Sequence, residues 1–342
     1  MSDADTRGGG RVVIVTGASA GIGRAVAARF AKAGDRVGLI ARDAAALQEV
    51  RRELEGAGAK AAWAAADVAD AEAVFAAAER LEAELGPVDV WVNDAMETVF
   101  SPVVDMTAEE FRRVTEVTYL GFVHGTMAAL KSMRPRDRGR IVQIGSALAY
   151  RGIPLQSAYC GAKHAIRGFT GSVRAELLHE GARVSVTMVD LPAVNTPQFD
   201  WARVHIPREP RPMGQPVEPE VVAEAIFEAA RGRWREYWLG WPTLETIVAN
   251  VLWPGALDRY LARKAVAGQE TDRLAQPDRR DNLEAPVGPL HRTRGSFSAE
   301  AASHAALVPA PVARFAVVGL GALVCLAAGG LAAGAAARAA RG

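Results

Sequence analysis

The sequence predicts an α/β protein built around a doubly wound parallel sheet. Over residues 11–190, short runs rich in β-branched residues alternate with stretches whose apolar residues recur at helical spacing. This alternation is typical of a parallel sheet covered by helices on both faces. The first apolar run also leads directly into a glycine-rich loop and then a helix. A chain of 342 residues can hold one such domain of about 250 residues and an appendage.

Each expected strand is a short apolar run bounded by turn residues. The strands are predicted at Val12–Thr16, Arg36–Ala41, Ala61–Ala65, Val88–Val92, Gly139–Gly145 and Val184–Val189. Helices are predicted between the first two strands, ending at Gly34, and near Ala108–Met133, Ala158–Glu180 and Glu220–Arg231. Right-handed crossovers between such strands place a ligand crevice at their carboxyl ends.

Composition excludes several classes of protein. The net charge of +1 gives no reason to expect a nucleic-acid partner, and the six histidines lack the spacing of a metal site. Cys160 and Cys325 lie far apart, which favours a reducing compartment without disulfides. Residues 1–10 are polar, so we expect a disordered N-terminus and no secretory signal.

The chain changes in texture after Asp190. Seven prolines break regular structure up to Pro219, so residues 190–219 are expected to form a lid over the crevice. The main domain is expected to span residues 11–232. Residues 266–311 are polar, contain several prolines and lack periodicity, which predicts a linker.

Residues 233–265 are rich in tryptophan and predict an amphipathic helical extension. Leu244, Ile247 and Val248 follow helical spacing, and Trp234 and Trp253 lie on either side of them. Such a segment either lies at a membrane interface, caps the core or forms a dimer contact. The sequence leaves these alternatives open.

The C-terminal segment predicts a transmembrane helix over residues 312–338. No residue from Phe315 to Ala337 is charged, and arginines flank the run at both ends. About 20 such residues can cross a bilayer. We therefore expect a membrane-anchored protein with its main domain in the cytoplasm; the alternative is an alanine-rich surface or disordered tail.

The loop Thr16-Gly17-Ala18-Ser19-Ala20-Gly21-Ile22-Gly23 predicts a dinucleotide site. Gly17 allows a tight turn, Gly21 lets the backbone approach a pyrophosphate, and Gly23 lets the helix pack against the strand. The second strand ends at Ala41 rather than at an acidic residue, and Arg42 follows it. A guanidinium can form two parallel hydrogen bonds to a 2′-phosphate, so NADP(H) is expected, and the hydroxyl of Ser19 could add a contact. The alternative is that Arg42 is exposed to solvent and binds nothing.

Ser146, Tyr159 and Lys163 predict the chemistry. Residues four apart on a helix share a face, so Lys163 lies beside Tyr159, where its ammonium is expected to lower the pKa of the phenol. Tyr159 would then move the proton that accompanies a hydride, and Ser146, at the end of a strand, would polarise the substrate oxygen.

These motifs resemble the short-chain dehydrogenase/reductase family, whose members carry one Rossmann-fold domain. The resemblance covers about residues 11–230 and implies that NAD(H) or NADP(H) serves to interconvert alcohols and carbonyls. It also implies that Tyr159 and Lys163 take part in cofactor binding. Further cofactor contacts that it implies come from Asp67, Val68, Asn93, Val194 and Thr196.

Three residues depart from the family pattern. Met96 replaces a glycine, Pro192 shifts a Pro-Gly turn, and Thr118 stands where an asparagine joins the proton relay.

From the motifs and the resemblance together we expect an NADP(H)-dependent oxidoreductase that acts on a secondary alcohol or ketone as a homo-oligomer. The apolar lid suggests that this substrate is hydrophobic. The alternative is a membrane-associated NADP-binding scaffold or redox sensor with little turnover.

Overall fold

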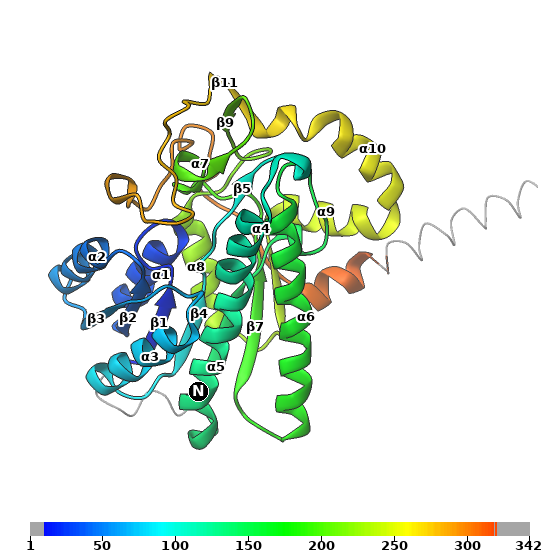
Figure 1. Cartoon of the computed structure of the whole chain (residues 1–342). Helices are drawn as coiled ribbons and strands as arrows, with labels where there is room; N and C mark the ends of the chain where they lie inside the picture. Colours follow the sequence, from blue (N-terminus) through cyan, green and yellow to red (C-terminus); the bar gives the residue numbers. More distant parts are fainter. Residues whose placement is uncertain (1–9, 318, 320–342) are drawn as a thin grey trace, which may run out of the picture.

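The computed structural model describes residues 10–317 and 319 (Figure 1). Within these residues the central sheet has eight strands in the order β12-β10-β7-β6-β4-β1-β2-β3. Neighbouring strands are parallel except at one edge, where β12 runs antiparallel to β10. The chain thus forms a Rossmann-like α/β fold, as predicted.

The apolar runs form the strands of the central sheet. They are β1 (Val12–Thr16), β2 (Arg36–Ala41), β3 (Ala61–Ala65), β4 (Val90–Asn93), β6 (Arg140–Ile144), β7 (Ser185–Asp190), β10 (Glu236–Leu239) and β12 (Leu307–Pro309). The first three match the predicted bounds, and the next three differ by one or two residues. Two small sheets pair β5 (Val99–Phe100) with β8 (Arg203–Val204), and β9 (Arg208–Pro210) with β11 (Glu270–Leu274).

Helices cover both faces of the sheet, because each presents an apolar side to it. The long helices are α1 (Gly21–Lys32), α2 (Ala44–Gly56), α3 (Ala71–Leu85), α4 (Ala108–Thr115), α5 (Gly121–Met133), α6 (Ser157–His179), α8 (Pro219–Arg231), α9 (Gly240–Leu252) and α10 (Pro254–Lys264). One buried core lies under α1, α2 and α8, and a second lies under α3, α5 and α6. The short α7 (Gln198–Trp201) lies in the lid segment.

The predicted helix at 108–133 is interrupted by a π-helical turn, η3 (Glu116–Leu120). Such turns occur often at functional sites. Thr118, which lies in this turn, is fully buried. The interruption therefore brings the predicted relay position into the interior.

The sequence predicted a helical extension over residues 233–265, but part of this segment is a strand. Residues 236–239 form β10, which pairs in parallel with β7 inside the central sheet. Trp238 on this strand is 2% exposed, whereas Trp241 and Trp253 beyond it are 69% and 64% exposed. The tryptophan-rich segment therefore divides into a core strand and two surface helices.

Residues 266–311 are not an extended linker. They contain β11, which pairs with β9, and β12, which completes the central sheet. Between these strands the chain crosses above α1 and α2, where Figure 1 shows it as a golden to orange loop. The segment is ordered because its backbone finds partners on the lid and because Leu283 and Phe297 are buried.

The predicted membrane anchor is contradicted. Among residues 10–317 and 319, no helix combines the length and apolarity needed to cross a bilayer. Most of the candidate segment at 312–338, with Cys325, lies outside the described residues. Its described beginning packs Ala313 against Trp238 and pairs Arg314 with Glu236 at 2.8 Å, contacts of a globular surface. The membrane-anchored localisation inferred from this segment is therefore wrong.

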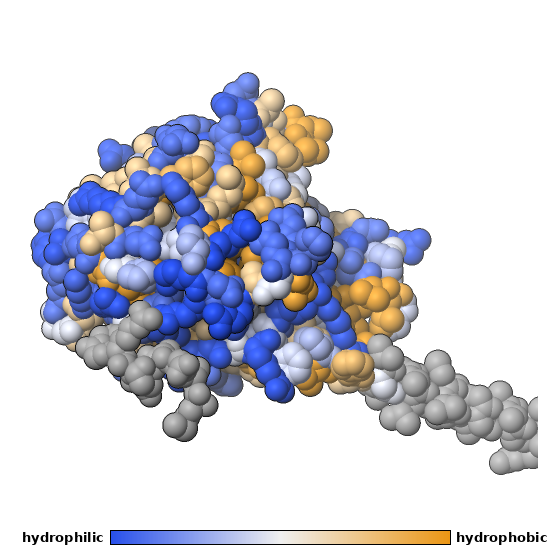
Figure 2. All heavy atoms as spheres, turned by 90° about the horizontal axis from the view of Figure 1, so that it is seen from below, coloured by the Kyte–Doolittle hydropathy of each residue, from blue (hydrophilic) through white to orange (hydrophobic). Residues whose placement is uncertain are grey.

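The underside of the molecule is mainly hydrophilic. Figure 2 shows charged and polar side chains across this face, with apolar ones between them and along one edge. Scattered apolar side chains are normal on the surface of a folded domain. The carboxyl edge of the sheet, at the opposite end, carries the predicted site residues.

Replacing Trp238 by alanine tests whether β10 belongs to the core. Because Trp238 is 2% exposed, Trp238→Ala should lower the free energy of unfolding by about 3–5 kcal/mol. Trp241→Ala is the matched control, since a residue that is 69% exposed should change stability by at most about 0.5 kcal/mol. Denaturant unfolding followed by circular dichroism measures both, and equal losses would contradict this assignment.

Candidate active site

The glycine loop joins β1 to α1, and two of its glycines have no room for a side chain. Gly17 has φ +72°, and a Cβ there would lie 2.9 Å from the Cα of Ala95. A Cβ on Gly23 would lie 2.3 Å from the carbonyl oxygen of Gly17. Glycine is therefore required both for the turn and for the contact between the loop and α1.

Thr16 fixes this loop to the strand beside it. Its hydroxyl accepts hydrogen bonds from the N–H groups of Asp94 and Ala95, at 3.1 and 3.3 Å. The loop after β4 is thereby held against the loop after β1. Because both follow the carboxyl ends of parallel strands, they form adjoining walls of one crevice.

A cavity lies between these loops. Its lining includes eight of the predicted cofactor residues: Gly17, Ser19, Gly21, Ile22, Arg42, Asp67, Val68 and Thr196. The departure residue Met96 lines it as well. The donors, glycine turns and helix N-terminus present here fit a dinucleotide.

Six predicted cofactor residues are not part of the lining: Thr16, Gly23, Asn93, Tyr159, Lys163 and Val194. The side chain of Asn93 is fully buried, where it accepts from Trp91 and donates to Thr126 and Gln143. Val194 pairs through its backbone with Val217. The place of Asn93 and Val194 among cofactor-binding residues, like that of Thr16, stays a prediction.

Ser146, Tyr159 and Lys163 come together at the carboxyl end of β6. Lys163 is 2% exposed, and its Nζ donates to the carbonyl oxygen of Ile144 at 2.7 Å. That Nζ lies 5.5 Å from the centre of the Tyr159 ring, so both side chains share one face of α6 as predicted. Ser146 is the second residue after the end of β6, and its hydroxyl accepts from Leu148 N–H at 3.1 Å, which caps the next turn.

Burial dominates the titration of these groups. It raises the pKa of Tyr159 above its usual value, and a hydrogen bond with Ser146 only partly opposes this effect. Burial also lowers the pKa of Lys163 to about 8, although Asp94 and Asp190 favour its charged form. The predicted lowering of the phenol pKa is therefore not found in this arrangement, because burial has the largest effect on Tyr159 and raises its pKa.

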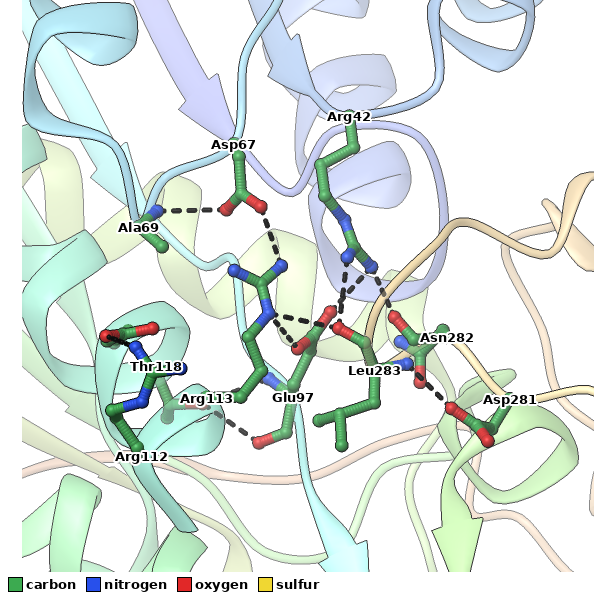
Figure 3. A network of polar contacts seen from close by, with 11 residues as sticks. Arg42, Asp67, Ala69, Glu97, Arg112, Arg113, Thr118, Asp281, Asn282 and Leu283 are labelled. Carbon is green, nitrogen blue, oxygen red and sulfur yellow. Dashed lines mark hydrogen bonds and ion pairs between the residues drawn. The ribbon is translucent and has the colours of Figure 1, made fainter. Parts of the chain in front are cut away.

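A second polar network closes the far end of the cavity (Figure 3). Arg42 lies 2.5 Å from a carboxylate oxygen of Glu97, and Arg113 lies 2.6 Å from one of Asp67. Although burial opposes ionisation of Asp67, its hydrogen bond with Arg113 keeps the pKa of that carboxyl below its usual value. Arg42 and Asp67 thus belong to one network, in which Glu97 and Arg113 lie between them.

Glu97 and Arg113 were not predicted. Glu97 is 2% exposed, and burial raises its pKa to about 8 against the attraction of Arg42 and Arg113. Thr118 holds it in place: its hydroxyl accepts from Glu97 N–H at 3.0 Å and donates to the carbonyl oxygen of Glu97 at 2.9 Å. A carboxylate four residues beyond a buried strand was a signal for Glu97; Arg113 looks like any surface residue of an amphipathic helix.

Residues from the end of the chain also line the cavity. These are Asn282, Pro286, Val287 and His291, all in the segment expected to be a linker. No pattern in the sequence indicated their position. The site is therefore built from both ends of the described chain.

Comparison with known proteins agrees with this geometry. A family model for short chain dehydrogenase matches residues 11–203. The chain belongs to the short-chain dehydrogenase family. It is 35% identical over 271 residues to an uncharacterized oxidoreductase, YxnA, of Bacillus subtilis (strain 168), covering 78% of this chain and 76% of the relative.

Two solved structures extend this family relationship to cofactor complexes. An alcohol dehydrogenase from the archaeon Thermococcus sibiricus with 5-hydroxy-NADP is 27% identical, with a TM-score of 0.59, covering 67% of this chain and 95% of that one. An actinorhodin polyketide ketoreductase with NADPH is 28% identical, with a TM-score of 0.59, covering 67% and 92%. This short-chain dehydrogenase thus shares its fold with proteins that bind phosphorylated dinucleotides.

Glu97→Gln tests the cost of burying this carboxylate. The raised pKa means that folded protein keeps a proton that unfolded protein loses, so the wild type loses stability as pH rises from about 4.5 to about 8. The variant cannot ionise and should have the higher melting temperature at pH 8.5, by a few degrees.

The difference should shrink toward pH 4.5, where Glu97 is protonated in both states. Glu109→Gln, on the exposed side of α4, is the matched control and should follow the wild type. Melting curves between pH 4.5 and 8.5 measure the effect. A difference that grows toward acid would contradict the assignment.

Proposed function

We propose that this short-chain dehydrogenase is an NADP(H)-dependent oxidoreductase that interconverts a secondary alcohol and a ketone. One observation carries the proposal: Lys163 Nζ lies 5.5 Å from the Tyr159 ring and 2.7 Å from the carbonyl oxygen of Ile144, next to Ser146. A proton donor, a cation and a hydroxyl thus converge at the edge of the sheet that also carries the glycine loop.

The residues of the site have distinct roles in this proposal. Gly17, Gly21 and the N-terminus of α1 would hold the pyrophosphate, and Asp67 and Val68 the adenine. The nicotinamide dinucleotide, when bound, supplies or accepts the hydride. Ser146 orients the substrate oxygen, Tyr159 gives its phenolic proton to the developing alkoxide or takes one back, and Lys163 favours the phenolate.

The raised pKa of Tyr159 suits one direction of the reaction. A phenol that keeps its proton is ready to act as the acid in carbonyl reduction. For alcohol oxidation the proton must first leave, and Lys163 is the nearby cation that can favour this. Because the hydroxyl of Thr118 binds the backbone of Glu97, we do not assign this side chain to a proton relay.

The preference for NADP(H) rests on Arg42. No carboxylate ends β2 to accept from a ribose 2′-hydroxyl, and Arg42 reaches the cavity with its guanidinium. The NADP-bound relatives agree with this choice. The apolar lid cluster of Phe100, Leu155, Phe199 and Phe297 supports a hydrophobic substrate.

The alternative is a dinucleotide-binding scaffold or sensor with little turnover. Two observations favour it: Lys163 donates its hydrogen bond to the carbonyl oxygen of Ile144, and the pKa of Tyr159 is raised rather than lowered. The two functions share a cofactor site and differ in catalysis.

Tyr159→Phe separates the two functions. The variant lacks only the phenolic oxygen, so reduction of a ketone panel with NADPH should fall by about 100-fold or more while NADPH binding stays intact. Cys160→Ser, which changes the next residue on α6, is the control for packing. Binding without turnover by the wild type on any ketone would favour the scaffold.

Arg42→Ala tests the cofactor preference. Loss of its charged hydrogen bonds should weaken NADPH binding by about 10- to 100-fold and leave NADH no weaker. Arg51→Ala, at a partly exposed position on α2 that pairs with Glu55, is the control for charge. Fluorescence titration measures both cofactors, and equal losses for the two would contradict the role of Arg42.

A further inference from the structure

The segment 281–297, here called the strap, lies across the outer side of the cofactor cavity. At the glycine loop, Gly21 N–H donates to the carbonyl oxygen of Arg292 at 3.0 Å. Arg24 Nη1 donates to the carbonyl oxygen of His291 at 2.9 Å. The strap therefore occupies a backbone donor at the N-terminus of α1, where a pyrophosphate is expected.

The strap also occupies the residue that would read a 2′-phosphate. Arg42 donates from Nη1 to the carbonyl oxygen of Leu283 at 3.2 Å and from Nη2 to that of Asn282 at 2.5 Å (Figure 3). Arg113 Nε adds a bond to the same oxygen of Leu283 at 3.0 Å. Carbonyl groups of the strap thus occupy donors at both ends of the site, alongside Glu97 at Arg42.

With the strap in this position the site is small. The cavity measures about 150 Å³. Sites for small molecules commonly measure about 300–1,000 Å³. Since strap residues form part of its wall, a dinucleotide needs the strap to move before it can fill the site.

Anchors hold the strap closed. Leu283 is fully buried against Val99, Val114 and Ala158. At the other end, Asn195 accepts from Phe297 N–H at 2.9 Å. Opening the strap therefore costs buried apolar surface as well as hydrogen bonds.

We propose that the strap makes the site selective for dinucleotides that carry a 2′-phosphate, because that group can take Arg42 from the strap carbonyls. This inference rests on the proposed function. A guanidinium and a phosphate pair through two parallel hydrogen bonds between opposite charges, whereas a bond from the same guanidinium to a carbonyl oxygen carries charge on the donor alone. A 2′-hydroxyl, in contrast, offers Arg42 no more than the carbonyl groups already do.

Glu97 also pairs with Arg42, so a phosphate bound to Arg42 would lie close to this carboxyl group. The groups that act on its charge are Arg42, Arg113, Asp67 and Glu284. Burial raises the pKa of Glu97 to about 8, so its neutral form is accessible near pH 7. Phosphate binding can therefore proceed with Glu97 protonated.

The first measurement is hydrogen exchange of the full-length protein with saturating NADPH. The N–H of Asn282 bonds to Trp201 and that of Gly295 to Asn195 in the closed strap. These amides and that of Phe297 should exchange at least about tenfold faster when NADPH is bound. NADPH binding that leaves them as protected as in the free protein would overturn the proposal while the proposed function stands.

The second measurement compares NADPH and NADH affinities of wild type and Leu283→Ala. The variant weakens the closed strap, so its NADH affinity should rise by about tenfold and the preference for NADPH should shrink. Leu274→Ala, at a residue that is 72% exposed on β11, is the control. Asp281→Ala removes the ion pair with Arg203 at 3.0 Å without opening a core cavity and should act in the same direction.

The outcomes separate the two ideas. An unchanged ratio of affinities in both strap variants would overturn the selective role and leave the proposed function untouched. Binding of NADPH by the strap variants alone would mean that a 2′-phosphate does not displace the strap, and would overturn the selective role. Failure of the wild type and of both variants to bind either cofactor would overturn the proposed function and the strap together.

Discussion

The close contact between the loop after β1 and the loop after β4 is the constraint on which the site depends. Thr16 binds two backbone N–H groups of the second loop, and Gly17 has no room for a side chain beside Ala95. These contacts fix where the crevice opens. Arg42, which follows β2, and Lys163, on α6 beside the end of β6, can then face a single ligand from its two ends.

Within this frame, burial has more influence on the charged groups than charge pairing does. It raises the pKa of both Tyr159 and Glu97 and lowers that of Lys163, although each has an oppositely acting neighbour. Water is largely excluded from these positions, which strengthens every remaining electrostatic interaction. The same exclusion explains why Thr118 satisfies the backbone of Glu97 instead of leaving it to solvent.

Much of the fold could be predicted because its signals are local. The alternation of apolar runs gave β1, β2 and β3 their bounds, and the spacing of four residues placed Tyr159 beside Lys163. The contact of Arg24 with His291 joins residues 267 positions apart, and nothing near either residue indicates it. The prediction of a membrane anchor failed for a related reason. An apolar run in the sequence shows its length and hydrophobicity, but not the surface against which its first residues pack.

β12 gives the end of the described chain a particular property. It returns to the central sheet beside β10, while β11 is held by β9, so the intervening loop is secured on either side. A loop tethered in this way cannot drift off when it leaves its seat, and its effective concentration near that seat stays high. In the proposed mechanism, re-closure of this loop is intramolecular, so dilution of the protein does not weaken its competition with the cofactor.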